Sequence, residues 1–143
     1  NPDRLVLEGK SKTRKEVLET YNQIDISLDP FPFQGNTITC ESVWMGVPVV
    51  TRGGSNFASR HSMTHLNHCG LSQWVHHSDE SFIDHATHWA KNLEALSNLR
   101  HQLRDQLLNS PACDGTQYTE DFAAFAREIW KAYLNKSNDS WTT

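Results

Sequence analysis

The sequence lacks a run of basic residues and any long apolar stretch. Its 13 lysines and arginines are outnumbered by 17 aspartates and glutamates, which gives a formal net charge of -4. Nucleic-acid affinity depends on clustered positive charge, so the composition argues against a nucleic-acid-binding surface. A bilayer-spanning helix needs about 20 mostly apolar residues, and we therefore expect no membrane span. No secretory signal pattern is visible.

Cysteine is also scarce. Cys40, Cys69 and Cys113 are odd in number, widely spaced and without a C-x-x-C pair. This pattern predicts reduced, mostly buried thiols in a cytoplasmic protein. His61, His65 and His68 share a helical spacing, but the carboxylate or thiolate ligands that usually complete a zinc site do not accompany them. We therefore predict no metal site, and expect histidines that are solvated or paired with amides.

What the sequence does contain is an alternation of strand and helix patterns. We expect strands at Arg4–Leu7, Ile24–Leu28 and Val47–Thr51, and a further short strand within Leu71–His76. Helices are expected at 12–21, from 37 or 38 to 45, at 57–69, and through most of the last half. This order predicts an α/β fold: a Rossmann-like parallel sheet with helices on both faces and a helical C-terminal third.

The predicted domain covers residues 1–134, and the polar segment 135–143 is expected to be a disordered tail. The last helix has an unusually wide apolar stripe. Its members are Phe122, Phe125, Ile129, Trp130 and Tyr133. On so short a chain we expect part of this stripe to be exposed, or buried by self-association.

The loop after the second predicted strand has the strongest chemical signal. Ligands of such sheets bind beyond the carboxyl ends of the strands. Here Gly35 is expected to let the backbone approach a ligand, and residues 36–39 open a helix whose first N–H groups lack partners. These groups form an anion site. Glu41, one turn later, is placed to accept hydrogen bonds from a ribose diol.

The predicted anion site has four members, to which the threonine hydroxyls add donors. They are Asn36, Thr37, Ile38 and Thr39. The alternative interpretation is that Thr37 is an ordinary helix cap and Glu41 a solvated helix residue.

The segment Leu28–Thr51 reads LDPFPFQGNTITCESVWMGVPVVT. This run resembles the signature of the O-GlcNAc transferase family, including its SPINDLY-like members. Tyr21 and Asp25 before it, and the ASR triplet at 58–60 after it, fit the same pattern. The resemblance covers about residues 4–134.

The resemblance implies the nucleotide-sugar-binding half of a GT-B glycosyltransferase, with two Rossmann-like halves facing a cleft. Such enzymes transfer a sugar with inversion to Ser or Thr of proteins, without a metal cofactor. By resemblance, Gly35, Asn36, Thr37 and Ile38 line the diphosphate and Glu41 holds the ribose. Arg14 falls where the family has a basic residue near the nucleoside. No catalytic residue is assigned.

The donor implied first is UDP-GlcNAc; a SPINDLY-like O-fucosyltransferase using a GDP sugar is the alternative. Many members have histidine where this chain has Asn36 and Val17, which motivates a third possibility, a catalytically silent binding module. The chain begins at Asn1 rather than Met. We expect an acceptor-binding half and helical TPR repeats upstream, and a piece that is inactive alone.

Overall fold

The computed structural model describes residues 1–9 and 13–139. Its regular elements alternate between helices and short strands. They are α1 (Arg14–Thr20), β1 (Ser27–Leu28), α2 (Thr37–Trp44), β2 (Val49–Arg52), α3 (His61–His68), β3 (Val75–His76), α4 (Asp79–Lys91), α5 (Leu93–Leu108) and α6 (Gly115–Asp139). Short 3-10 turns occupy Pro2–Arg4, Tyr21–Gln23, Ala58–Arg60, Ser72–Trp74 and Pro111–Cys113.

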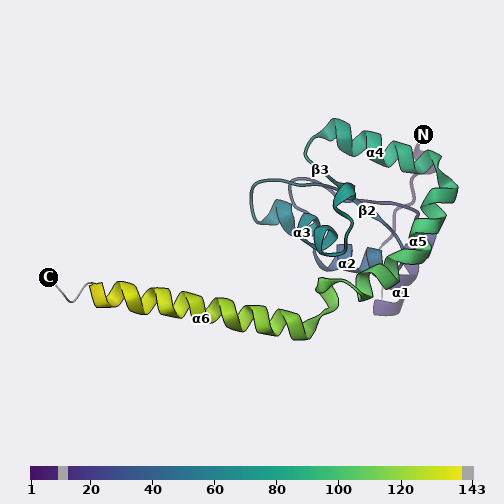
Figure 1. Cartoon of the computed structure of the whole chain (residues 1–143). Coiled ribbons are helices and arrows are strands. Elements are labelled where there is room, and N and C mark those ends of the chain that lie inside the picture. Colours follow the sequence, from purple (N-terminus) through teal and green to yellow (C-terminus); the bar gives the residue numbers. More distant parts are fainter. Residues whose placement is uncertain (10–12, 140–143) are drawn as a thin grey trace.

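The three strands form one parallel sheet in the order β1-β2-β3. Ser27 pairs with Val49, and Thr51 pairs with Val75. In Figure 1, α4 runs above the strands and α2 below them. The predicted α/β class with a parallel sheet is therefore confirmed.

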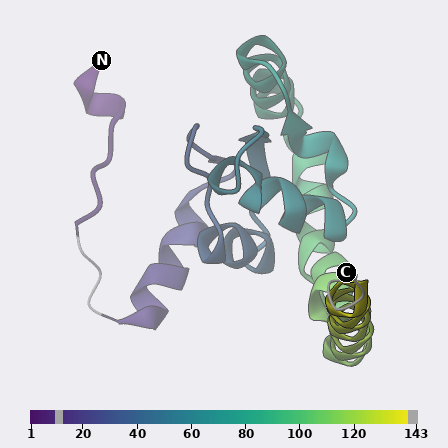
Figure 2. The same ribbon diagram turned by 90° about the vertical axis from the view of Figure 1, so that its left-hand side faces the viewer.

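The prediction of a strand at Arg4–Leu7 is wrong. Pro2–Arg4 form a 3-10 turn, and residues 5–9 have no regular structure. Leu5, Val6 and Leu7 are 71%, 79% and 91% exposed, and Figure 2 shows this segment standing apart from the folded body. An apolar run has the composition of a strand, but only a paired neighbour makes it one. The third strand is instead β3, within the predicted Leu71–His76.

The helix predicted at 12–21 is observed as α1. Lys12 lies outside the described residues, and the helix begins at Arg14 after an N-terminal capping box made by Thr13 and Glu16. In that box, the Thr13 hydroxyl accepts the Glu16 N–H at 3.2 Å, and the Glu16 carboxylate accepts the Thr13 N–H at 2.7 Å. The helix start is thus fixed by local chemistry.

The core lies between the sheet and the surrounding helices. Its buried residues come from α2, β2, α3, α5 and the segment that leads into β3. They are Val43, Val49, Val50, Leu66, Cys69, Leu71, Trp74, Leu96, Leu103 and Leu107. Trp74, which is fully buried, packs against Trp89 with ring centroids 5.0 Å apart.

The three cysteines are free, but they are not mostly buried as predicted. Cys69 lies in the core, Cys40 is half-buried and Cys113 is exposed. Burial raises the pKa of Cys69 and of Cys40, so both favour the neutral thiol.

The last helix, α6, projects from the body as a single rod (Figure 1). Phe122, Phe125 and Ile129 are 59%, 64% and 55% exposed, and Trp130 and Tyr133 are 59% and 61% exposed. The predicted exposure of the apolar stripe is confirmed. In the segment 135–143, predicted to be a disordered tail, α6 continues to Asp139; residues 140–143 lie outside the described residues.

Within residues 1–9 and 13–139, none of the helices combines the length and the apolar character that a bilayer crossing requires.

Candidate functional site: the N-terminus of helix α2

Helix α2 begins with unsatisfied backbone donors. Asn36 is its N-cap residue, but the side chain makes no capping hydrogen bond. The Asn36 carbonyl accepts the N–H groups of Thr39 and Cys40 at 3.1 and 3.3 Å. Within the described part of the chain, the N–H groups of Thr37 and Ile38 have no acceptor. Two donors at the positive end of the helix dipole are therefore free for an anion.

These donors border a cavity of about 400 Å³ beside the carboxyl end of β1. Gly35, Asn36, Thr37, Ile38 and Thr39 all line it. The other lining residues come from β1, the loop that follows it and the start of β2. They are Ser27, Leu28, Asp29, Pro30, Phe33, Gln34 and Val49. Five of the seven residues predicted to bind the donor thus share one wall.

The loop before α2 is held by a buried carboxylate. Asp29 is 7% exposed, and its two oxygens accept the Gly35 N–H at 2.7 Å and the Thr51 hydroxyl at 2.6 Å. Gln34 is 1% exposed; its amide donates to the Arg52 carbonyl at 2.8 Å. The turn into the helix is therefore tied to β2 before any ligand arrives.

Close packing within the protein also requires glycine at position 35. A Cβ atom there would lie 2.7 Å from the Thr39 hydroxyl and 3.3 Å from Asp29 Oδ1. The space that glycine leaves is thus filled by the protein's own polar groups. Ser62 completes this packing, because its hydroxyl contacts Thr39 Oγ1 at 2.7 Å and donates to the Gly35 carbonyl at 3.0 Å. Glycine here lets the loop pack closely against α2 and α3.

The remaining two predicted residues, Arg14 and Glu41, pair with each other. Arg14 Nη2 lies 2.7 Å from Glu41 Oε1, and the Glu41 side chain is 11% exposed. Neither residue is among those that line the cavity. Beside them, burial and then the Glu41 carboxylate raise the pKa of Tyr21, which Arg14 lowers. The Tyr21 hydroxyl donates to the Ile38 carbonyl at 3.3 Å, which connects this ion pair to the first turn of α2.

Aromatic side chains surround the neighbouring loops. Phe33 and Phe57 are 70% and 77% exposed, and the His61 ring meets each edge-on, at 6.3 and 4.5 Å between centroids. The Arg52 guanidinium lies 4.3 Å from the Phe31 ring centroid and 2.8 Å from Asp79. Aromatic rings and the Arg52–Asp79 ion pair thus lie together at the carboxyl end of the sheet.

The histidines of α3 do not converge on a common point. His65 Nε2 lies 2.7 Å from the Asn36 amide oxygen, so this histidine is paired with an amide, as expected. Over residues 1–9 and 13–139, no three His, Cys, Asp or Glu side chains are placed to hold a metal ion together.

Several residues that shape the site were not predicted from the sequence. They are Asp29, Gln34, Ser62 and His65. Asp29 and Gln34 lie inside the loop that carried the signal, and a buried polar residue at a strand end is a recognisable sign of loop anchoring. Ser62 had no signal, and the pairing of His65 with Asn36 in particular could not be foreseen, because the partners are 27 and 29 residues away.

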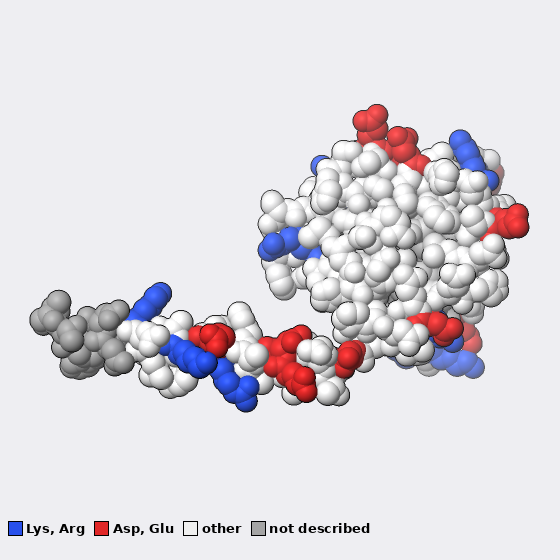
Figure 3. Space-filling model, in the orientation of Figure 1, with Lys and Arg blue, Asp and Glu red and all other residues white. Residues whose placement is uncertain are grey.

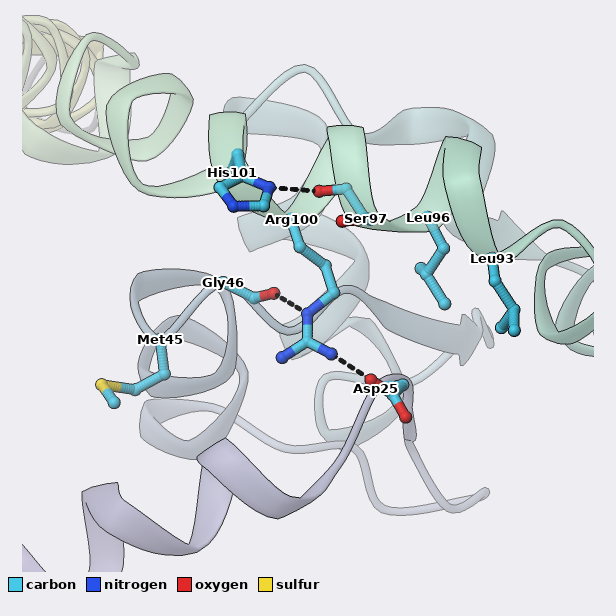
Figure 4. Close-up of a pocket in the computed structure, with 8 residues that line it drawn as sticks. All are labelled: Asp25, Met45, Gly46, Leu93, Leu96, Ser97, Arg100 and His101. Atoms are coloured by element: carbon cyan, nitrogen blue, oxygen red, sulfur yellow. Dashed lines mark hydrogen bonds and ion pairs between the residues drawn. The ribbon is translucent and has the colours of Figure 1, made fainter.

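A second cavity, of about 470 Å³, lies at the amino ends of the strands (Figure 4). Here Arg100 of α5 forms an ion pair with Asp25 and donates to the Gly46 carbonyl at 2.9 Å. Met45, Leu93 and Leu96 are among its other walls. The charged groups of this cavity already have each other as partners.

Charge is sparse on the face of the body that Figure 3 shows. Lys, Arg, Asp and Glu gather at its margins, while α6 presents both signs along its length. This face has no continuous basic patch.

Comparisons with known proteins bear on the family and the fold of the chain. The model of the family described as "Glycosyl transferase family 41" matches residues 1–122. A protein of Solanum lycopersicum named "Probable UDP-N-acetylglucosamine--peptide N-acetylglucosaminyltransferase SPINDLY" is 40% identical over 134 residues, which is 94% of this chain. A UDP-N-acetylglucosamine--peptide N-acetylglucosaminyltransferase of Caenorhabditis elegans is 24% identical over 93% of the chain.

Among solved structures, a mutant O-GlcNAc transferase from Thermobaculum terrenum superposes with a TM-score of 0.79 at 34% identity. The match covers 88% of this chain and 24% of that one. The chain spans 14% of the length of its tomato relative and 12% of the nematode one. It is thus similar to one region of longer transferases, and the chain belongs to glycosyl transferase family 41.

Proposed function

We propose that this chain is the donor-binding part of an inverting, metal-independent protein O-glycosyltransferase. The nucleotide sugar places its diphosphate at the N-terminus of α2. The observation that carries this proposal is the pair of free N–H groups on Thr37 and Ile38 beside a cavity of about 400 Å³. Free donors at a helix N-terminus favour phosphate oxygens, and this helix starts at the end of the sheet where such folds bind ligands.

In this proposal, Glu41 accepts the ribose hydroxyls. Arg14 binds Oε1 at 2.7 Å, and no described side chain hydrogen-bonds to Oε2. Arg14 is 70% exposed in its side chain, so it holds the carboxylate from the solvent side. The ion pair orients Glu41 without using its full capacity as an acceptor.

The donor proposed first is UDP-GlcNAc, with Ser or Thr of a protein as acceptor. It rests on the names of the relatives, which describe transfer of N-acetylglucosamine from its UDP form to a peptide. A GDP-fucose donor is the alternative within the family. An acceptor-binding half and TPR repeats would lie in the remainder of such an enzyme, since the relatives are much longer than this chain. A cytoplasmic location stays a prediction.

A catalytically silent binding module is the second candidate. Asn36 and Val17 motivate it, because an amide cannot gain a positive charge and valine cannot stack as an imidazole does. Val17 is 36% exposed on α1, so it could still pack against a base.

The test is a calorimetric titration of the complete polypeptide, with both halves, against UDP, GDP and their sugars. The nucleotide that binds identifies the donor class, and sugar transfer to a peptide separates an enzyme from a silent module. Glu41→Ala removes charge-assisted bonds of about 1.5–3 kcal/mol each, which lowers affinity roughly tenfold or more. Glu19→Ala is the matched control, because Glu19 is an exposed glutamate of α1 that pairs only loosely, at 3.6 Å, with Lys15. Equal affinity of wild type and Glu41→Ala, in a folded protein, would exclude Glu41 as the ribose ligand.

A further inference from the structure

The Asn36 side chain lies at the proposed phosphate position and can present either of two chemically opposite groups to a ligand. Its amide carries an oxygen that repels phosphate and an NH2 group that attracts it. The side chain is exposed at the cavity wall and makes no capping bond to its own helix. Something outside α2 must therefore decide which end of the amide meets the ligand.

His65 supplies that constraint from α3. Its Nε2 lies 2.7 Å from Asn36 Oδ1, and because an amide oxygen only accepts, the imidazole must donate. Burial, and then His61 and His68 of the same helix, lower the pKa of His65. A neutral ring has one N–H, and the bond to Asn36 places it on Nε2.

Hydrogen bonds hold helix α3 against the loop that precedes α2, and His65 is therefore carried by a well-anchored helix. Ser62, one turn earlier, bonds to Thr39 and to the Gly35 carbonyl. The Met63 N–H donates to the Gln34 amide oxygen at 3.3 Å. His65 is half-buried beside these contacts. The imidazole that binds Asn36 is thus carried by a helix that several hydrogen bonds hold against the loop.

We propose that His65 is a positioning residue of the donor site, which binds the Asn36 amide oxygen and so turns the Asn36 NH2 group toward the diphosphate. This inference rests on the proposed function, because it assumes that a diphosphate occupies the cavity beside α2. His65 itself does not contact the ligand. It acts through Asn36, and its effect should be confined to ligands that carry phosphate.

The experiment is a double-mutant cycle in the complete polypeptide, with UDP and GDP as phosphate-bearing probes and uridine and guanosine as probes without phosphate. His65→Ala is expected to weaken binding of the preferred nucleoside diphosphate about fivefold, the loss of roughly one hydrogen bond. Binding of the matching nucleoside should not change. In the Asn36→Ala background, the same His65→Ala substitution should have no further effect.

His65→Gln and His68→Ala complete the design. Glutamine can offer an N–H near the place of Nε2, so His65→Gln should recover most of the affinity, which a merely structural role would not predict. His68→Ala removes an exposed histidine of the same helix and should leave the affinity unchanged.

The outcomes distinguish a failure of the proposed function from a failure of the proposed role of His65. If wild type binds neither diphosphate, the proposed function and this inference both fail. If wild type binds but His65→Ala binds equally well, the inference alone fails. It also fails if His65→Ala weakens the nucleoside as much as the diphosphate, or weakens binding equally in the Asn36→Ala background.

Discussion

The two ends of the sheet have cavities of similar size but opposite character. At the carboxyl end, about 400 Å³ is bordered by the free N–H groups of Thr37 and Ile38. At the amino end, about 470 Å³ contains Arg100, whose guanidinium is already bound to Asp25 and to the Gly46 carbonyl (Figure 4). The larger of these two cavities, at the amino end, is thus the one in which the guanidinium already has hydrogen-bond partners.

The difference follows from the direction of the helices. α2 presents its N-terminus to the carboxyl-end cavity and its C-terminus to the other end, so unpaired donors gather at one side and unpaired carbonyls at the other. Two arginines of α5 bind the carbonyls: Arg100 holds Gly46, and Arg104 holds Trp44 at 2.8 Å. Arginine side chains thus bind the carbonyls at the C-terminus of α2, whereas the Asp29 carboxylate at the other end binds the Gly35 N–H and not those of Thr37 and Ile38. Two backbone donors therefore remain for a phosphate at the carboxyl end.

The largest effect is expected from removing the Asp29 carboxylate, which holds the loop at the carboxyl end of the sheet. Asp29→Ala leaves the Gly35 N–H and the buried Thr51 hydroxyl without an acceptor. At about 1–3 kcal/mol for each buried unpaired group, the free energy of unfolding should fall by about 3 kcal/mol, and nucleotide binding should be lost. Chemical denaturation and calorimetry measure the two effects. Asp29→Asn keeps one acceptor oxygen and should lose less; equal losses for both variants would contradict the anchoring role.

At the amino end, substitution should affect stability alone. Arg100→Met removes the ion pair with Asp25 and the charge-assisted bond to Gly46, so the free energy of unfolding should fall by about 2 kcal/mol. Nucleotide affinity should stay at its wild-type value. Lys131→Met, which breaks an exposed ion pair with Glu128 on α6, is the control and should cost about 0.5 kcal/mol or less. A loss of nucleotide affinity in folded Arg100→Met would show that the two ends are coupled.

Low pH is expected to lower the folding stability through His85, which lies beside β3. Burial, and then His76 and His88, lower the pKa of His85 to about 4 from the usual 6.5. The folded state therefore disfavours the charged ring, so stability is complete above pH 6.5 and declines as the pH falls from 6.5 to 4. Denaturation at several pH values should show this decline, with a shallower slope in His85→Phe, which keeps an aromatic ring against Trp74. Identical slopes would exclude His85 as a source of the acid sensitivity.

The smallest effect is expected within the donor site itself. Thr37→Ala removes a hydroxyl but keeps the backbone N–H that we assign to the phosphate, so affinity should fall less than about threefold. Titration of Thr37→Ala beside Thr37→Ser, which keeps the hydroxyl, measures that contribution. A tenfold loss in Thr37→Ala would mean that the side chain, and not the helix N-terminus, binds the phosphate.

The sequence by itself determined the parts of this protein that depend on local chemistry. The alternation of apolar patterns predicted the α/β class, and the run from Leu28 to Thr51 located the loop and the helix start that line the cavity. The capping box at Thr13 and Glu16 is likewise readable from spacing alone. Each of these signals lies within a few residues of the structure it produces, so neighbouring residues are enough to reveal it.

Tertiary structure decided everything that depends on partners far apart in the chain. Arg4–Leu7 has a strand-like composition but no pairing partner, while Val75–His76 becomes a strand because β2 lies beside it. Gly35 is required by the Thr39 hydroxyl, and Asn36 meets a histidine 29 residues later. Strand pairing, close packing and side-chain hydrogen bonds across such distances depend on the positions of whole elements, which local propensity does not encode.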